Sequence, residues 1–204
     1  MRSLSELHLD ALTEVFNVGA GRAASSLSEI VADEVKLSVP RIQFYQSSEI
    51  DANSLFFDNS MLGAVKQQFN GPFDATAMLL FTEDRALEIV RDMVGSQLSI
   101  EELAEFEQEA MCELGNIILN ACLSVMADML GLTLTSSLPD YFVDSSLAIT
   151  RQIIDEGDRS LILALHIDLN IESRHSHGYL VFLLSSSSLS ELVAHIDGFL
   201  SGIG

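Results

Sequence analysis

The chain carries the segment ALTEVFNVGAGRAASSLSEIVADEVKLSVP at residues 11–40 and the segment AMCELGNIILNACLSVMADMLGLTLTSSLP at residues 110–139. The two segments align without gaps, 99 residues apart, and keep the same apolar rhythm although most residues differ. Three conspicuous pairs stay identical: Glu14 and Glu113, Asn17 and Asn116, and Pro40 and Pro139. Because an exposed helix face has little structural reason to keep a glutamate and an asparagine, the repeat predicts two copies of one site.

The length of the chain fits one domain made of two fused halves. At 204 residues, the chain can bury a sizeable core. A repeat near 99 residues is too long for a solenoid unit and predicts two homologous halves, at about residues 1–97 and 98–204.

Periodicity and turn signals give both halves a similar order of elements. In the first half they predict a helix over 4–31, a strand over 36–46, a hairpin of 61–69 with 73–81 around Asn70-Gly71-Pro72, and a helix over 83–94 ended by Gly95. In the second half they predict a helix over 99–130 between a Ser99–Glu102 capping box and Gly131, then strands over 132–137, 147–155, 159–169 and 177–184, and a helix over 188–200. Glu156-Gly157-Asp158 predicts a second hairpin.

These elements predict an α/β (α+β) fold with a pseudo-twofold axis. We expect one β-sheet that is continuous between the halves and carries the two long helices on its surface.

Composition narrows the function classes. The net charge of −20, with only Lys36, Lys66 and eight arginines, argues against nucleic acid and anionic membranes and favours a basic protein partner. Cys112 and Cys122 lie roughly 15 Å apart along the predicted helix and cannot bridge each other. The start MRSLSELHLD lacks the apolar region of a signal peptide, and the longest apolar run, near Leu161–Leu165, is far shorter than a membrane span. The sequence therefore predicts a cytoplasmic protein without membrane insertion.

Each long helix carries a polar triplet opposite its apolar stripe: Asp10, Glu14 and Asn17 in the first helix, and Glu109, Glu113 and Asn116 in the second. An ordinary solvated helix face also carries carboxylates and amides, but two copies in register weaken that interpretation. Asparagine in a helix interior costs roughly 0.5 kcal/mol against alanine, so its return calls for a local reason. We predict that these side chains point to solvent.

The glutamate and asparagine of each triplet suit a site that acts on a phosphorylated partner protein. No serine, cysteine or histidine shares the face, and one carboxylate with one carboxamide is a poor cage for a metal. A carboxamide both donates and accepts hydrogen bonds, so it can hold a water in line with a phosphorus atom. A glutamate one turn away can bind a lysine of the phosphorylated partner.

Asp10-x-x-x-Glu14-x-x-Asn17, followed after 22 intervening residues by Pro40, resembles the signature of the CheC family of chemotaxis phosphatases, which includes CheX and FliY-type proteins. The stretches NVGAGRAASSLS from Asn17 and ELGNIILN from Glu113 look like that family's two helices, and the resemblance covers essentially the whole chain. Glu109 stands where the family usually has Asp or Ser, and Phe16 where it often has Gly.

The resemblance implies a function in chemotaxis and two-component signalling. It implies a hydrolase that dephosphorylates the aspartyl phosphate of a CheY-like receiver, with Glu14 and Glu113 contacting the receiver lysine and Asn17 and Asn116 aligning water. The magnesium then belongs to the receiver, and the chain has no cofactor of its own. The rival is a non-enzymatic adaptor that binds the receiver or the CheD deamidase.

Smaller patterns carry less weight. Gly19-Ala-Gly21 predicts close helix packing rather than a phosphate-binding loop. His175 and His177 are interpreted as loop residues, not as metal ligands. Gly115 beside Asn116, where Phe16 stands beside Asn17, leads us to expect that the second site is the more active one.

Overall fold

The computed structural model describes residues 4–46, 60–94, 99–156, 161–171 and 174–202. Its elements follow the chain in the order α1 (Glu6–Val31), β1 (Val35–Gln46), β2 (Met61–Asn70), β3 (Ala75–Thr82), α2 (Glu83–Val94), α3 (Ile100–Leu130), β4 (Thr135–Ser136), β5 (Asp140–Ser145), α4 (Ser146–Glu156), β6 (Leu161–Ile171), β7 (Arg174–Leu184) and α5 (Ser186–Gly202). The predicted mixed α/β class is confirmed.

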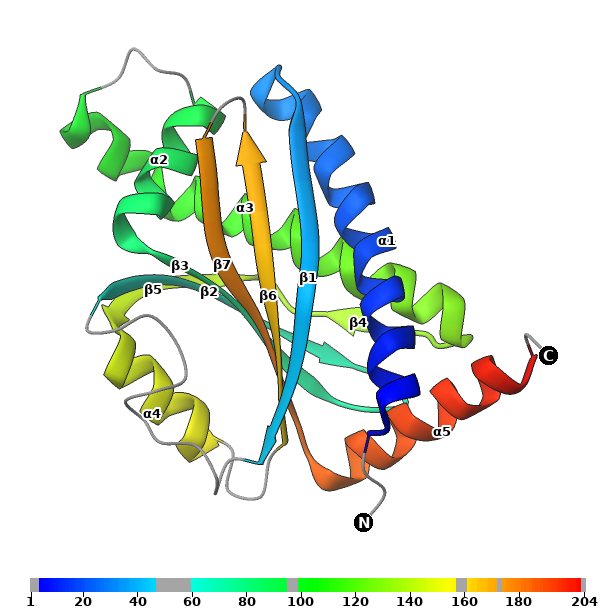
Figure 1. Ribbon diagram of the computed structural model, residues 1–204. Helices are drawn as coiled ribbons and strands as arrows, with labels where there is room; N and C mark the ends of the chain where they lie inside the picture. Colours follow the sequence, from blue (N-terminus) through cyan, green and yellow to red (C-terminus); the bar gives the residue numbers. More distant parts are fainter. Residues whose placement is uncertain (1–3, 47–59, 95–98, 157–160, 172–173, 203–204) are drawn as a thin grey trace.

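All strands join one antiparallel sheet in the order β1-β6-β7-β3-β2-β4, with β5 also pairing β2. The order is unchanged when β1 is exchanged with β4 and β5, β2 with β6, and β3 with β7 (Figure 1). Each half therefore lends its edge strand to the hairpin of the other half. The helix ends match too, because Ala32 and Gly131, again 99 residues apart, both adopt the left-handed conformation. The division at about residue 97 stays a prediction.

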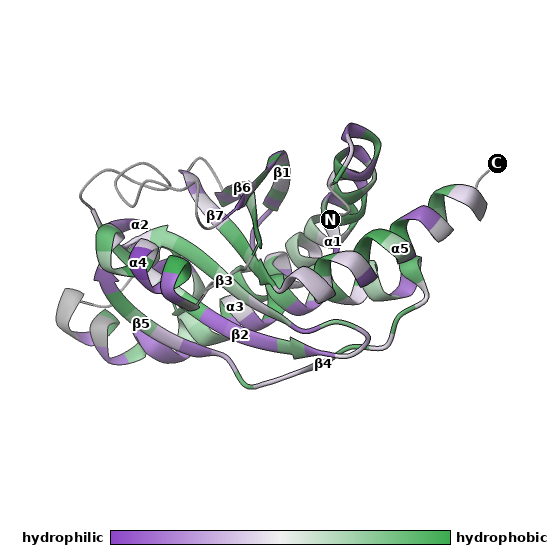
Figure 2. Cartoon of the chain, turned by 90° about the horizontal axis from the view of Figure 1, so that it is seen from below, coloured by the Kyte–Doolittle hydropathy of each residue, from purple (hydrophilic) through white to green (hydrophobic). Residues whose placement is uncertain are grey.

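The sheet separates two cores. Side chains from α1, α2, α3 and α5 pack with alternate strand residues such as Leu79 and Phe81 on one face. On the other face, α4 covers Met78 and Leu80. Strand β3 and the last five residues of β7, Leu180 to Leu184, are largely hydrophobic (Figure 2), as expected where strands are buried on both faces.

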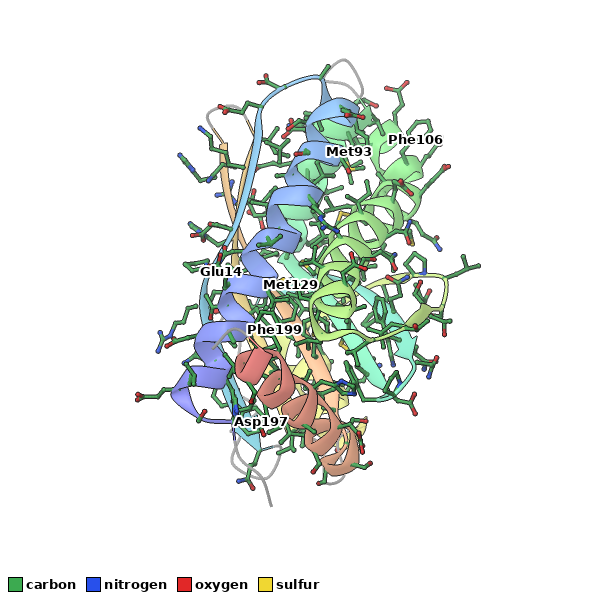
Figure 3. All side chains as sticks on the ribbon, turned by 90° about the vertical axis from the view of Figure 1, so that its right-hand side faces the viewer. Glu14, Met93, Phe106, Met129, Asp197 and Phe199 are labelled. Carbon is green, nitrogen blue, oxygen red and sulfur yellow. The ribbon has the colours of Figure 1, made fainter. Side chains whose placement is uncertain are left out.

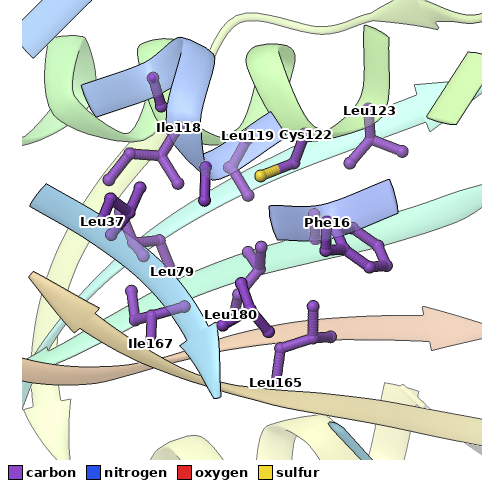
Figure 4. Packing of buried hydrophobic residues seen from close by; sticks show 14 of the residues in the cluster. Phe16, Leu37, Leu79, Ile118, Leu119, Cys122, Leu123, Leu165, Ile167 and Leu180 are labelled. Carbon is purple, nitrogen blue, oxygen red and sulfur yellow. The ribbon is translucent and has the colours of Figure 1, made fainter. Parts of the chain in front are cut away.

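Helices α1 and α3 touch at a glycine. A Cβ built on Gly19 would lie 2.6 Å from Cα of Cys122, so only glycine permits this approach. The predicted close packing at this glycine is confirmed, whereas a Cβ on Gly21 would have no atom within 4 Å. Phe16 and Ile118 extend from the two helices toward Leu79 and Leu180 of the sheet (Figure 4).

Several sequence expectations differ from the structure. The strand predicted over 132–137 covers only Thr135–Ser136, and β5 lies where no strand is predicted. The predicted strand over 147–155 is wrong, because the segment forms α4: Ser145 accepts from the Ala148 N–H as a helix cap, and Ile149 and Ile153 face the sheet one turn apart. The hairpin predicted at Glu156-Gly157-Asp158 is therefore wrong, because Glu156 ends helix α4 rather than a strand; Gly157 and Asp158, like Gly95, lie outside the described residues. His175 and His177 belong to strand β7 rather than to a loop.

Helix α3 also corrects the expectation about apolar runs. By length and composition, Glu105–Leu130 would suffice to cross a membrane. However, 61% of its most apolar window is buried inside the protein, which is typical of a core helix.

The glycine contact gives a matched pair of stability tests. Gly19→Val should lower the free energy of unfolding by about 3 kcal/mol, because the branched side chain would push into the α3 backbone. Gly21→Ala, two positions away in open space, should instead raise it by about 0.5–1 kcal/mol through helix propensity. Urea unfolding followed by circular dichroism measures both values, and equal effects would contradict the proposed helix contact.

Candidate active site

The predicted acidic and asparagine residues of the site lie on α1 and α3, the helix pair of the main core, whereas Pro40 lies in β1 and Pro139 between β4 and β5. Asp10, Glu14, Glu109 and Glu113 are exposed, as predicted from the helix faces. Figure 3 shows Glu14 on the side of α1 next to β1, whereas Phe106 marks the early part of α3. Asn17 and Asn116 are only half exposed, so the prediction that both asparagines point to solvent needs correction.

Asn17 binds the backbone of β1. Its Nδ2 donates to the carbonyl oxygens of Thr13, at 2.9 Å, and Val39, at 3.1 Å. Its Oδ1 accepts from the Val39 N–H at 2.9 Å. Both amide protons of Asn17 are therefore bound. Its carboxamide hydrogen-bonds to both the N–H and the carbonyl of Val39, as a neighbouring strand would, and so joins α1 to β1.

Pro40 explains why Val39 needs this partner. The pairing of β1 with β6 is interrupted between Ser38 and Arg41, so Val39 and Pro40 have no ladder partners. Pro40 has no N–H to satisfy, but Val39 has both a donor and an acceptor, and its side chain is buried. The spacing from Asn17 to the proline thus reflects a helix side chain that satisfies a strand bulge.

In the second copy, strand pairing is also interrupted before the proline, but the unpaired residue is exposed rather than bound by the asparagine. Its edge strand is broken into β4 and β5 around Leu138 and Pro139, the counterparts of Val39 and Pro40. Here Leu138 points outward and is 89% exposed, whereas Val39 is 1% exposed. No hydrogen bond joins Asn116 to this strand among the described residues.

Asn116 is held by Asn120 instead. Nδ2 of Asn120 donates to the backbone oxygen of Asn116 at 2.8 Å and to its Oδ1 at 2.7 Å. Within the described part of the chain, Nδ2 of Asn116 has no acceptor. The second carboxamide therefore keeps donors available that the first has already committed.

Asn116 lines a groove of about 670 Å³, together with Glu109, Glu113, Cys112 and Pro139. Apolar side chains form the rest of its wall: Ile30, Met93, Val94, Phe106, Ala110 and Leu138. Four of these are exposed large hydrophobic residues, namely Ile30, Val94, Phe106 and Leu138. Carboxylates beside an open apolar surface are typical of a docking site rather than of a solvated helix face.

The rim that carries Leu138 is firmly anchored. On one side, Gln67 Nε2 donates to the Ser137 carbonyl at 2.7 Å. On the other, the Cys112 thiol donates to the Pro139 carbonyl at 3.8 Å, and the Tyr141 hydroxyl donates to Glu107 on α3. Burial and this carboxylate raise the pKa of Tyr141, so the hydroxyl keeps the proton that it donates.

Cys112 is a poor nucleophile in this groove. Partial burial and the nearby charge of Asp140 raise the pKa of its thiol, which favours the protonated form. The second cysteine, Cys122, is buried among the core side chains, and burial raises its pKa to about 12. Among the described residues, no group of three or more His, Cys, Asp or Glu side chains is placed to hold a metal ion.

Phe16 and Gly115 do not crowd or open the two sites. Phe16 is 1% exposed and packs against the ring of Phe182 in the core. Gly115 faces Val65 of the sheet, where a Cβ would clash. Crowding by Phe16 therefore gives no reason to expect a more active second site. The different hydrogen bonds of Asn17 and Asn116 give another reason for that expectation.

Sequence reasoning missed Asn120 and the apolar groove wall. Asn120 had a signal, since it lies four residues after Asn116 on the same helix and is equally unfavourable there. Leu138 had none, because only the tertiary position of its strand leaves it exposed.

The different roles of the two asparagines predict different effects on stability. Asn17→Ala should lower the free energy of unfolding by about 2 kcal/mol, because the N–H and carbonyl of Val39 lose their partner. Asn116→Ala should stay within about 0.5 kcal/mol of the original chain, since helix propensity offsets the lost bond to Asn120. Urea denaturation of the two variants side by side measures the difference. A loss for Asn17→Ala no larger than that for Asn116→Ala would contradict the bridging role.

The sequence is similar to those of two known phosphatases of bacterial chemotaxis and the flagellar motor. The chain is 25% identical over 166 residues to the CheY-P phosphatase CheC of Bacillus subtilis, covering 76% of this chain and 73% of that protein. It is 30% identical over 104 residues to the flagellar motor switch phosphatase FliY of the same organism, covering 49% of this chain but only 27% of FliY. No family model matches the chain.

Solved structures share the fold. The FliY crystal structure from Thermotoga maritima aligns with a TM-score of 0.76 at 18% identity, covering 97% of this chain and all of that one. CheX of Borrelia burgdorferi, solved as a complex with CheY, BeF3 and Mg²⁺, aligns with a TM-score of 0.50 at 14% identity over 84% of this chain and 97% of that one. In sequence and in fold, the chain is thus a relative of the CheC family of chemotaxis phosphatases.

Proposed function

We propose that this protein accelerates hydrolysis of the aspartyl phosphate of a CheY-like receiver, with the second site as its main active site. The observation that carries the proposal is the Asn116 carboxamide, which lines an open groove with a donor left free by the described residues. A relative named as a CheY-P phosphatase supports the reaction, and the CheX–CheY complex supports the kind of partner.

The reaction needs positioning more than covalent chemistry. Water attacks the phosphorus atom, the bond from phosphorus to the receiver carboxylate breaks, and inorganic phosphate and a free carboxylate result. Asn116 aligns the attacking water, and Glu113, one turn earlier and exposed, binds the positive charge of a receiver lysine. A water-positioning amide plays the same part in GTPase hydrolysis.

The metal belongs to the partner in this proposal. One carboxylate and one carboxamide supply too few oxygen ligands for a magnesium ion, which binds carboxylates together with phosphate oxygens. The ion therefore reaches the site with the phosphorylated receiver and neutralises phosphoryl charge there. We propose a cytoplasmic location for the protein, because its proposed substrate is a phosphorylated CheY-like receiver.

The groove suits a partner with mixed character. Glu109 and Glu113 favour a basic residue, and the net charge of −20 attracts a positively charged surface from a distance. Phe106 and Leu138 offer apolar area beside these charges. We expect the receiver to place an apolar side chain between them while its lysine reaches Glu113.

The first site has a mainly structural role in this proposal. Glu14 is exposed and can contact a receiver, but both amide protons of Asn17 are held by backbone carbonyls.

The alternative function is a non-enzymatic adaptor that binds the receiver or CheD. Both functions predict binding, and only the phosphatase predicts that an asparagine variant binds without turnover.

Asn116→Ala should lower stimulated dephosphorylation about 10²-fold, since the water-positioning group is lost while the docking surface remains. Decay of a phosphorylated receiver measures turnover, and titration against the receiver with beryllofluoride and Mg²⁺ measures affinity, which should change less than about twofold. Because both amide protons of Asn17 are already bound, adding Asn17→Ala to Asn116→Ala should lower turnover little further. Near-normal decay rates in the double variant would refute the mechanism.

Glu113→Lys should weaken receiver binding more than Glu113→Ala, because it places like charges together where the alanine only removes an attraction. The same titration measures both, with Glu191→Lys on α5 as a control that changes the net charge equally at another exposed position. Equal affinities for the two Glu113 variants would contradict contact with a receiver lysine.

A further inference from the structure

We infer that Asn120 is a positioning residue that sets the orientation of the Asn116 carboxamide. This inference rests on the proposed function, because it concerns the same amide. It adds a residue outside the Glu-x-x-Asn pair and explains why only one of the two copies keeps its amide donors available.

The hydrogen bonds determine the orientation of both amides. The backbone oxygen of Asn116 can only accept, so the group that Asn120 turns toward it at 2.8 Å must be its NH2. That same nitrogen lies 2.7 Å from the side chain of Asn116 and must meet an acceptor there. Oδ1 of Asn116 therefore faces Asn120, and its NH2 group is directed elsewhere.

The positions of the two residues fit this division of roles. Asn116 lines the groove that holds Glu113, whereas Asn120 lines a separate polar pocket of about 230 Å³ with Ser124 and Asp128. Asn120 thus supports Asn116 from behind without reaching the groove itself. Both side chains are half-buried, which limits competition from water for the bond between them.

The first copy shows what happens without this support. The counterpart of Asn120, 99 residues earlier, is Gly21, which has no side chain to donate a hydrogen bond. There, Oδ1 of Asn17 accepts from Val39 N–H instead, and both protons of Nδ2 bind backbone carbonyls. The copy that has Asn120 leaves the NH2 group of its site asparagine without a backbone acceptor among the described residues. The copy that has Gly21 binds both protons of that group to backbone carbonyls.

The consequence for the reaction is a fixed set of hydrogen-bonding groups. With one Oδ1 lone pair bound to Asn120, Asn116 presents two N–H donors and one remaining lone pair to the groove. The donors suit phosphoryl oxygens and the lone pair suits a hydrogen of the attacking water. Without Asn120, the amide rotates, and only a fraction of molecules have the productive orientation.

The test compares Asn120→Ala and Asn120→Asp with the control Ser124→Ala, one turn further along α3. Aspartate has the shape of asparagine but cannot donate, and Ser124→Ala changes helix propensity to a similar degree without touching Asn116. Steady-state dephosphorylation of a receiver should show kcat about tenfold lower for both Asn120 variants, with KM unchanged. Ser124→Ala should match the original chain in both constants.

A double-variant cycle separates this inference from the proposed function. Asn120→Ala added to Asn116→Ala should cost no further activity, since Asn120 acts only through that amide. If Asn116→Ala alone lowers kcat but both Asn120 variants keep the original kcat, or if they raise KM instead, the positioning role is overturned and the phosphatase function stands. If Asn116→Ala itself leaves turnover unchanged, the proposed function fails. Unfolding midpoints above the assay temperature for each variant exclude loss of fold as the cause.

Discussion

The contact between α1 and α3 at Gly19 is the constraint on which the rest of the structure depends. Because no Cβ fits between Gly19 and the Cys122 backbone, the two long helices lie close together on one face of the sheet. Their apolar stripes then fill a shared core, with side chains such as Phe16 and Ile118 pointing inward. The opposite sides of both helices, with Glu14 and Glu113, remain at the surface.

Each edge strand is interrupted at a proline, and the two halves of the protein satisfy the interrupted backbone in different ways. The peptide before each proline loses its ladder partner, and an unpaired buried backbone group costs about 1–3 kcal/mol. In the first half, Asn17 supplies the missing hydrogen bonds to Val39. In the second, Leu138 turns outward, so no buried peptide needs Asn116 and the amide lines a groove. One motif thus gives a structural bridge in one copy and an open site in the other.

The groove combines the features that a protein partner requires. Exposed apolar side chains supply contact area, and carboxylates of α3 supply charge complementarity toward a basic surface. The net charge of −20 repels phosphate groups, and the absence of a nucleic-acid partner stays a prediction. The long apolar helix behind the groove serves the core, because most of its apolar window is buried.

The sequence by itself determined the long helices, their capping box at Ser99, the first hairpin and the repeated Glu-x-x-Asn, since periodicity, caps and turns act over a few residues. It misplaced α4, because the β-branched Ile149, Thr150 and Ile153 favour a strand locally while packing against the sheet selects a helix. Only the tertiary structure decided what each asparagine binds. That choice depends on Val39, Asn120 and Leu138, whose backbone and side-chain positions follow from long-range strand pairing and helix packing.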